Sequence, residues 1–204
     1  SSDLRSVLGI RPLLWKNGWP VAGEVFKEGT YEIESERRGY ALELAVDFVR
    51  MEYTRHRFWE KDDTPVVPLK SQMLEDVIET WPQGKINVRI GDYMFRPHQK
   101  WTITAVPDGG GYLGGPYYKI VIEGTNRALA ATADAEVVTV PEFTGAPEQL
   151  WRIDQLTDGT YRIMPKEVPG TDKELVLVSV GDSTPSLGEF DMNSDNSKWN
   201  FRDH

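Results

Sequence analysis

Apolar and polar residues alternate over several short stretches of this chain, and turn-forming residues separate the stretches. The clearest are residues 101–106 (Trp-Thr-Ile-Thr-Ala-Val) and residues 151–156 (Trp-Arg-Ile-Asp-Gln-Leu). Successive side chains of a β-strand point to opposite faces, so a period of two is typical of strands that bury one face. The pattern predicts an all-β protein.

Each of these stretches begins at a tryptophan that follows a similar tripeptide. The tetrapeptides are His98-Gln99-Lys100-Trp101, Glu148-Gln149-Leu150-Trp151 and, with Ser in place of Gln, Asn196-Ser197-Lys198-Trp199. The three tryptophans are 50 and 48 residues apart. Similarity at a nearly constant spacing indicates that the chain repeats one structural unit.

Two further strands recur in each unit. The first is a Tyr-x-Ile strand, at Tyr31-Glu32-Ile33, Tyr118-Lys119-Ile120 and Tyr161-Arg162-Ile163. The second is a short apolar strand, at Ala41-Leu42-Glu43-Leu44, Ala128-Leu129-Ala130-Ala131 and Glu174-Leu175-Val176-Leu177. On this alignment the tyrosine precedes the leucine by 11 residues in the first two units and by 14 in the third. The tyrosine precedes the closing tryptophan by 70, 33 and 38 residues, so the first unit has an insertion of about 35 residues.

Three copies of a four-strand unit, each ending in Gln-x-Trp, resemble the ricin-type β-trefoil of carbohydrate-binding module family 13. The resemblance covers roughly residues 26–204. It implies an all-β β-trefoil domain over residues 25–204, with an insertion at residues 45–85 in the first repeat. It also implies that Trp101, Trp151 and Trp199 belong to the core.

The insertion contains the pattern of a short amphipathic helix. Ser71 can cap its N-terminus, and Pro82 and Gly84 end it. Its apolar stripe consists of Met73, Leu74, Val77, Ile78 and Trp81. We expect this stripe to dock on the barrel. The alternative is that it binds a partner.

Residues 1–24 fall outside the repeat and contain the hairpin signal Asn17-Gly18. Residues 10–15 (Ile-Arg-Pro-Leu-Leu-Trp) and 18–21 (Gly-Trp-Pro-Val) resemble the closing strands of the five-bladed propeller of glycoside hydrolase family 43, as in arabinanases. That resemblance implies a catalytic propeller upstream, which carries the acid and base carboxylates, so no residue of this sequence is assigned to catalysis. The alternative is a plain hairpin that leads into the first trefoil unit.

Composition limits the classes of partner. A net charge of −9 and a pI near 4.9 argue against nucleic acid and against an anionic membrane surface. No apolar run approaches the roughly 18 residues that indicate a membrane-spanning helix. The absence of cysteine excludes disulfides and thiolate metal sites.

Little in the sequence suggests an enzyme. His56, His98 and His204 lack the spacing of a zinc site, and no Gly-x-Ser-x-Gly elbow occurs. A solvated acidic surface accounts for the 32 Asp and Glu residues. We therefore expect no metal site, no cofactor and no catalytic residue in this chain.

The trefoil resemblance implies a sugar site in each unit. There, an acidic residue on the second strand accepts hydrogen bonds from sugar hydroxyls, an aromatic ring stacks on the apolar face of the sugar, and the Gln of Gln-x-Trp holds the carboxylate. In the first unit the acidic position falls on Glu43, and the aromatic position falls on Gly91, with Asp92 and Tyr93 beside it. Gln99 is the Gln of Gln-x-Trp, and His98 directly precedes it. The predicted carbohydrate-binding residues are Glu43, Asp92, Tyr93, His98 and Gln99.

The other two units lack the acidic residue. The position falls on Ala130 in the second unit and on Val176 in the third, so both sites look inactive. Alternatives remain in the first unit, where Glu43 could be an exposed strand carboxylate and His98 a turn histidine bonded to backbone. Trp59 is expected to be exposed, where it could stack on sugar or face another domain.

Together, the two resemblances imply a non-catalytic carbohydrate-binding module of a family 43 glycoside hydrolase that is secreted, periplasmic or attached to the cell surface. Its expected partners are an arabinan- or xylan-type polysaccharide and a catalytic domain in cis. The alternative is a structural accessory domain that packs on the propeller without binding sugar, which the loss of two acidic positions favours.

Overall fold

The computed structural model describes residues 13–16, 19–22, 26–37, 40–46, 78–112, 115–180 and 184–203. Their central feature is a ring of strands that closes on itself. The closed ring contains six antiparallel strands, paired in the order β3–β6–β7–β10–β11–β14 and back to β3. Their bounds are Gly29–Ser35 (β3), Trp101–Tyr112 (β6), Gly115–Ile122 (β7), Trp151–Gln155 (β10), Tyr161–Pro165 (β11) and Trp199–Asp203 (β14). Ring closure removes the unpaired edges of an open sheet.

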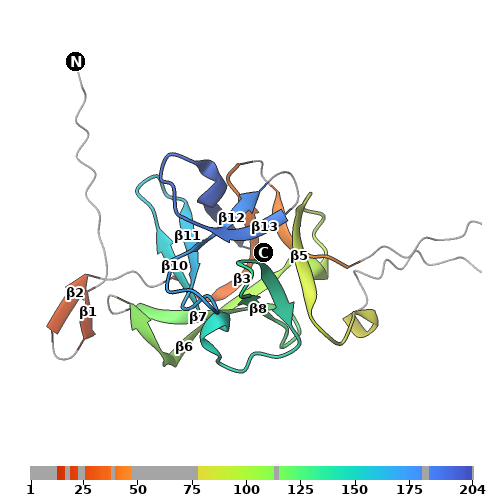
Figure 1. The fold of residues 1–204 in the computed structure, drawn as a ribbon, viewed down its shortest axis with the longest axis horizontal. Helices are drawn as coiled ribbons and strands as arrows, with labels where there is room; N and C mark the ends of the chain where they lie inside the picture. The colour runs from red at the N-terminus through yellow and green to blue at the C-terminus, as the bar shows by residue number, and fades with distance from the viewer. Residues whose placement is uncertain are drawn as a thin grey trace, which may run out of the picture.

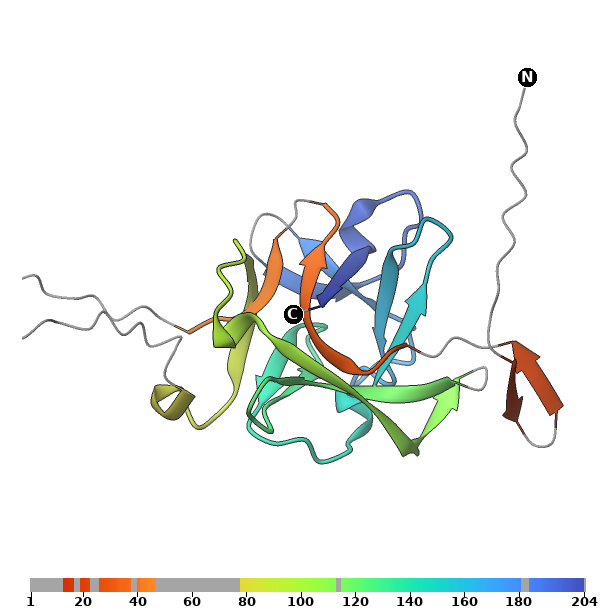
Figure 2. The ribbon, with the colours of Figure 1, turned by 180° about the vertical axis from the view of Figure 1, so that it is seen from behind.

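Three hairpins alternate with pairs of ring strands along the chain. They are β4 (Ala41–Leu44) with β5 (Ile86–Gly91), β8 (Ala128–Ala131) with β9 (Val137–Val140), and β12 (Val176–Val180) with β13 (Thr184–Gly188). The chain thus contains three four-strand lobes, which we call lobe 1 (β3–β6), lobe 2 (β7–β10) and lobe 3 (β11–β14). In Figures 1 and 2 the lobes follow one another around a common centre. This arrangement is a β-trefoil.

The three repeated tryptophans make the same contacts in all three lobes. Each lies opposite the tyrosine of a Tyr-x-Ile strand, in the pairs Trp101–Tyr31, Trp151–Tyr118 and Trp199–Tyr161. Each indole Nε1 donates to a leucine carbonyl of its own lobe, at 2.8 Å (Leu42), 2.9 Å (Leu129) and 2.8 Å (Leu177). All three indoles are fully buried. The hydrogen bond is required because an unpaired buried N–H would be costly.

A short 3₁₀ turn precedes each of these tryptophans. The turns are η3 (Pro97–Gln99), η4 (Pro147–Gln149) and η5 (Asp195–Ser197). In the first two, proline stands at the start, where its fixed φ and missing N–H are tolerated. Each turn directs the residue two before the tryptophan inward, and Gln99, Gln149 and Ser197 are all buried.

Aromatic side chains pack together inside the ring around Phe26, with ring centroids 4.6–5.9 Å from the Phe26 ring. They are Tyr31, Tyr118, Tyr161 and Phe201. The backbone N–H of Phe26 donates to the Tyr118 hydroxyl at 2.7 Å, and that hydroxyl donates to the Phe26 carbonyl at 3.2 Å. Burial raises the pKa of Tyr118. The segment before β3 is therefore anchored in the core.

The register of lobe 3 differs from the sequence alignment. The hydrogen bond from Trp199 identifies Leu177, not Leu175, as the leucine equivalent to Leu42. The position that corresponds to Glu43 is therefore Val178, and the prediction of Val176 was wrong. Five additional residues between β11 and β12 caused the error. Spacing alone does not show where a strand resumes after an enlarged loop.

The glycine-rich segment at residues 107–111 lies in the hairpin of β6 and β7. β6 continues to Tyr112, which pairs with Gly115, and the register shifts between Val106 and Gly111. A Cβ on Gly111 would lie 2.4 Å from the Gly115 carbonyl oxygen, so the close approach of the two strands requires glycine there.

The insertion and the N-terminal segment are described only in part. Of the expected helix, the structure describes the 3₁₀ turn η2 (Ile78–Thr80) and the buried Trp81. Ser71, Met73, Leu74 and Val77 lie outside the described residues, as does Trp59. Strands β1 (Leu13–Lys16) and β2 (Trp19–Ala22) form a hairpin, and among the described strands they pair only with each other.

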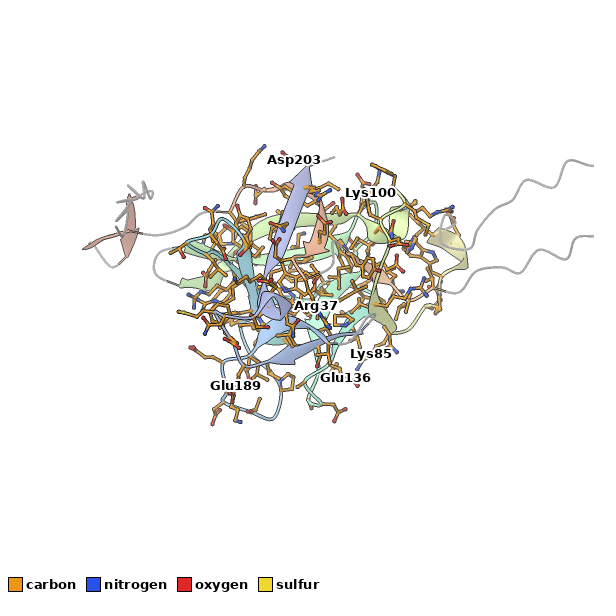
Figure 3. All side chains as sticks on the ribbon, turned by 90° about the horizontal axis from the view of Figure 1, so that it is seen from above. Arg37, Lys85, Lys100, Glu136, Glu189 and Asp203 are labelled. Carbon is orange, nitrogen blue, oxygen red and sulfur yellow. The ribbon has the colours of Figure 1, made fainter. Side chains whose placement is uncertain are left out.

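Charged side chains surround this core. Lys85, Glu136 and Glu189 project outward from the ribbon (Figure 3) and are exposed. Within the described part of the chain, no helix has the length and apolar character needed to cross a membrane.

Candidate functional site

The first lobe contains a cluster of four polar side chains around Glu43, here called the Glu43 cluster: Glu43, Arg89, His98 and Gln99. Glu43 lies on β4 directly opposite Arg89 on β5, and only 3% of its surface is exposed. Gly91 follows on β5, where an added Cβ would lie 2.9 Å from Glu43 Oε1. The carboxylate therefore occupies the space that a side chain at position 91 would need.

Both carboxylate oxygens of Glu43 accept hydrogen bonds. Arg89 Nε donates to Oε1 at 2.5 Å, and Gln99 Nε2 donates to Oε2 at 2.6 Å. His98 Nε2 lies 3.2 Å from Oε2. Burial by itself raises the pKa of Glu43, but the hydrogen bonds from His98, Arg89 and Gln99 outweigh it and leave this pKa below its ordinary value. The cluster is therefore built around an ionised carboxylate.

Gln99 connects this carboxylate to the chain segment before η3. Its Nε2 also donates to the Asp92 carbonyl at 2.8 Å, and its Oε1 accepts from the Met94 backbone N–H at 2.8 Å. Both amide protons and the amide oxygen of Gln99 thus have partners. Glu43 fixes Gln99, and Gln99 fixes the backbone of residues 92–94.

The segment held in this way, residues 92–95, has an exposed aromatic surface, and we call it the lobe-1 rim. The Phe95 side chain is 75% exposed, and its ring centroid lies 4.7 Å from that of Tyr93. Phe95 has a φ of 58°, which non-glycine residues rarely adopt. Met94 is 42% exposed, and Asp92 is exposed beside it. A strained, solvent-facing aromatic residue is a common feature of binding sites.

His98 contributes one nitrogen to the cluster and leaves the other without a partner. The ring is fully buried, and its Nδ1 has no hydrogen-bond partner among the described residues. When Nε2 donates to Glu43, Nδ1 of the neutral ring carries a lone pair rather than a proton. Burying an unpaired lone pair costs less than burying an unpaired N–H.

The structure brings together three of the five predicted site residues, Glu43, His98 and Gln99. Asp92 and Tyr93 adjoin them on the lobe-1 rim. The alternative of an exposed strand carboxylate does not describe Glu43, which is buried. The alternative of a turn histidine bonded to backbone does not describe His98, whose side chain contacts Glu43.

Arg89 and Phe95 were not among the residues predicted for this site. The alternation of residues 85–90 places Arg89 on the face opposite Ile86, Val88 and Ile90, so a cross-strand pairing with Glu43 could have been sought. Phe95 had no such signal, because its exposure follows from the backbone conformation.

Lobes 2 and 3 keep the framework of this site but not its charge. Ala130 and Val178 occupy the Glu43 position. Gln149 Oε1 still accepts from the Thr144 N–H at 2.7 Å, whereas Ser197 Oγ donates to the Asp191 carbonyl at 3.2 Å. The aromatic rings nearby face cations, with Lys119 Nζ 5.5 Å from the Phe143 ring and Arg162 Cζ 4.9 Å from the Phe190 ring.

No group of three or more histidine or acidic side chains could hold a metal ion in the part of the chain that the structure describes. The lobe-1 rim offers a carboxylate and two aromatic rings at the surface. This combination can accept hydrogen bonds and stack on a flat apolar face.

The closed ring, the three hairpins and the repeated tryptophan contacts define a β-trefoil domain. A family model described as ricin-type beta-trefoil lectin domain-like matches residues 97–185, a little under half of the chain. No match was found among curated protein sequences.

Solved structures share this fold at low sequence identity. A mosquitocidal holotoxin is 13% identical with a TM-score of 0.58, covering 88% of this chain and 18% of that chain. The Polyporus squamosus lectin, bound to the human-type influenza-binding epitope Neu5Acα2-6Galβ1-4GlcNAc, is 16% identical with a TM-score of 0.56, covering 87% and 50%. An exo-β-1,3-galactanase from Clostridium thermocellum is 16% identical with a TM-score of 0.53, covering 90% and 32%. The chain thus spans half or less of each of these proteins.

Proposed function

We propose that this domain binds a carbohydrate at the lobe-1 rim and does not itself catalyse a reaction. The observation that carries the proposal is the pair of rings formed by Tyr93 and Phe95, on a segment whose backbone Gln99 ties to the buried Glu43 carboxylate. Removing one partner from a buried charged group is strongly destabilising, so the cluster keeps one geometry. It thereby holds the backbone that carries the rings.

The residues of lobe 1 divide into two roles in this proposal. Asp92, Tyr93 and Phe95 contact the sugar, because the carboxylate can accept from two hydroxyls and the rings can cover an apolar sugar face. Glu43, His98 and Gln99 are positioning residues, since their polar groups are buried and mostly engaged with one another. Gln99 transmits their order to the rim through Asp92 and Met94.

The wider context is also part of the proposal. Residues 10–21 resemble the closing strands of a family 43 propeller, and residues 13–22 contain a regular hairpin. One solved structure with this fold is an exo-β-1,3-galactanase, of which the matched region is 32%. A secreted, periplasmic or cell-surface glycoside hydrolase of this type would use the domain to hold an arabinan- or xylan-type chain near its catalytic propeller. Tethering raises effective concentration, so modest affinity suffices.

A second candidate function is a scaffold domain that packs on the propeller and binds no sugar. The substitution of the acidic residue by Ala130 and Val178 favours it. So does the burial of Glu43, which leaves this carboxylate no exposed surface for a hydroxyl.

Affinity electrophoresis in gels that contain arabinan, xylan or galactan separates the two candidates. We expect retardation of the wild-type chain by at least one polysaccharide, and about tenfold weaker retardation of Phe95→Ala, which corresponds to roughly 1.4 kcal/mol. Asp92→Asn should weaken it similarly. Met192→Ala is a matched control, because Met192 is 71% exposed at the lobe-3 position equivalent to Met94. Unretarded wild-type protein in every gel would favour the scaffold.

A further inference from the structure

The loop between β11 and β12 distinguishes lobe 3 from the other two lobes. It comprises residues 166–175, whereas the corresponding loops in lobes 1 and 2 comprise residues 36–40 and 123–127. The enlargement is five residues. Because the ring and the hairpin of lobe 3 are otherwise regular, these residues are not needed to complete the fold.

The enlarged loop has a defined shape. At its start, the Lys166 N–H donates to the Leu150 carbonyl at 2.7 Å, and at its end Leu175 is buried. Between them, Val168 is buried and pairs with Thr171 across a turn. Gly170 has a φ of 81° and follows Pro169, the combination typical of a type II turn. The loop is thus anchored at three points and can form a fixed wall.

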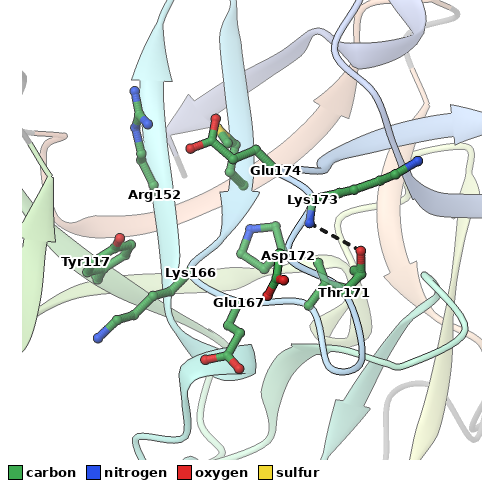
Figure 4. Close-up of a pocket in the computed structure, with 11 residues that line it drawn as sticks. Tyr117, Arg152, Lys166, Glu167, Thr171, Asp172, Lys173 and Glu174 are labelled. Carbon is green, nitrogen blue, oxygen red and sulfur yellow. Dashed lines mark hydrogen bonds between the residues drawn. The ribbon is translucent and has the colours of Figure 1, made fainter.

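This wall lines one side of an open pocket of about 300 Å³, which we call the lobe-3 pocket (Figure 4). Its opposite side consists of Tyr117 on β7 and Arg152 on β10, and its apolar lining includes Met164 and Val168. Lys166 extends along this side, with Nζ 5.2 Å from the Tyr117 ring and donating to the Gly109 carbonyl at 2.6 Å. The pocket lies away from the Val178 and Ser197 positions that correspond to the Glu43 cluster.

The charges that line the pocket balance. Its lining contains three cationic and three acidic residues, namely Arg152, Lys166, Lys173, Glu167, Asp172 and Glu174. Balanced lining charge disfavours both a strongly anionic and a strongly cationic ligand. In the described part of the chain, these carboxylates are also not close enough together to form a metal site. A neutral ligand with many hydroxyls fits this lining, because it can donate to the carboxylates and accept from the cations.

We infer that the lobe-3 pocket binds one neutral sugar unit, as a second glycan subsite that is not equivalent to the lobe-1 rim. The inference rests on the proposed function in that it assigns a further contact with the same polysaccharide. Asp172 and Glu174 accept hydroxyl hydrogen bonds, and Tyr117 with the Lys166 stem supplies the apolar contact. Two subsites on different lobes allow one polysaccharide to bind at two points, which raises its overall affinity.

Titration of ¹⁵N-labelled chain with L-arabinose, D-xylose and D-galactose, followed by amide chemical shifts, tests each site separately. The amides of Gly170–Glu174 report on the lobe-3 pocket, and those of Gly91–Phe95 report on the lobe-1 rim. We expect at least one sugar to shift the first group saturably. Asp172→Asn should weaken that response at least about tenfold. Asp134→Asn, which makes the same charge change at an exposed position outside the pocket, should not.

The two proposals fail in different ways. Shifts at residues 170–174 that persist in Phe95→Ala, with none at residues 91–95, would support the pocket and contradict the rim. Shifts confined to residues 91–95 would overturn the pocket. So would a response at residues 170–174 that is unchanged in Asp172→Asn, because the carboxylate would then have no part in binding.

Discussion

Glu43 in lobe 1 and Val178 in lobe 3 occupy the same place on their hairpins. Each follows the leucine whose carbonyl accepts the indole hydrogen bond, and each lies beside a glycine of the next strand. In lobe 1 the residue opposite Glu43 is Arg89, and His98 and Gln99 also contact the carboxylate. In lobe 3 the residue opposite Val178 is Ser186. The backbone has been kept while the chemistry on it has changed.

The difference shows which constraints the three lobes share. Each tryptophan must fill the same space and find a carbonyl, since a missing ring would leave a large cavity. The residue beside that carbonyl has only to be compatible with its own neighbours. A charged residue there requires several polar partners, and only lobe 1 retains all of them.

The largest effect should appear where the lobes are alike. Trp101→Ala and Trp199→Ala should each lower the free energy of unfolding by about 3–5 kcal/mol, because each removes a fully buried ring and leaves a leucine carbonyl unpaired. Urea denaturation measures this. A cost below about 1 kcal/mol for either variant would show that the lobes do not share one core.

A smaller effect should appear where the lobes differ. Glu43→Ala leaves the buried His98 and the partly buried Arg89 without their carboxylate and should cost about 3 kcal/mol. Val178→Ala removes part of a half-buried aliphatic side chain at the equivalent position and should cost about 1 kcal/mol. Equal costs in urea denaturation would mean that the Glu43 cluster contributes no more than ordinary packing.

The glycines beside these residues sharpen the comparison. Gly91→Ala should cost about 1–3 kcal/mol, because its Cβ would meet Glu43 Oε1 at 2.9 Å. In a Glu43→Ala background this additional cost should vanish, and a double-mutant cycle measures that coupling. Gly188→Ala is the control, since its Cβ would meet Val178 Cγ2 at 3.3 Å and the smaller conflict should cost less. Additive costs for Gly91→Ala and Glu43→Ala would contradict the predicted clash.

The smallest expected effect is on the pH dependence of stability. The pKa of folded Glu43 lies below its ordinary value of 4.5, so its contribution is present above about pH 4.5 and is lost as the pH falls through the folded-state pKa. Glu43→Gln should remove this part of the acid destabilisation, measured as the free energy of unfolding between pH 3 and pH 7. An unchanged pH profile would show that Glu43 does not titrate with folding.

Asp158, in the turn between β10 and β11, makes a second acid-sensitive contribution to stability. Hydrogen bonds from Thr160 and Lys198 hold its pKa at about 2. Its contribution is present above the ordinary value of 3.8 and is lost as the pH falls toward 2. Asp158→Asn should therefore flatten the profile between about pH 3.8 and pH 2. Equal profiles for Asp158→Asn and wild type down to pH 2 would contradict this assignment.

Much of the fold could be predicted because the core repeats. The tryptophan spacing and the Tyr-x-Ile strands identified three lobes, since each ring fills an equivalent position and its strand partner recurs with it. The β-trefoil fold and the grouping of Glu43, His98 and Gln99 followed from the resemblance of that repeat to the ricin-type β-trefoil. The lobe-3 register did not, because the enlarged loop hides where β12 begins.

By itself, the sequence determined the number of lobes and the residues that pack inside them, because burial of large aromatic side chains recurs with the repeat. The tertiary structure alone decided that Glu43 is buried, that Arg89 and Gly91 surround it, and that Phe95 faces solvent. These properties depend on strand pairing and on one unusual backbone angle, which bring together residues that are far apart in the chain. They also decide whether a carboxylate contacts a ligand or supports the residues that do.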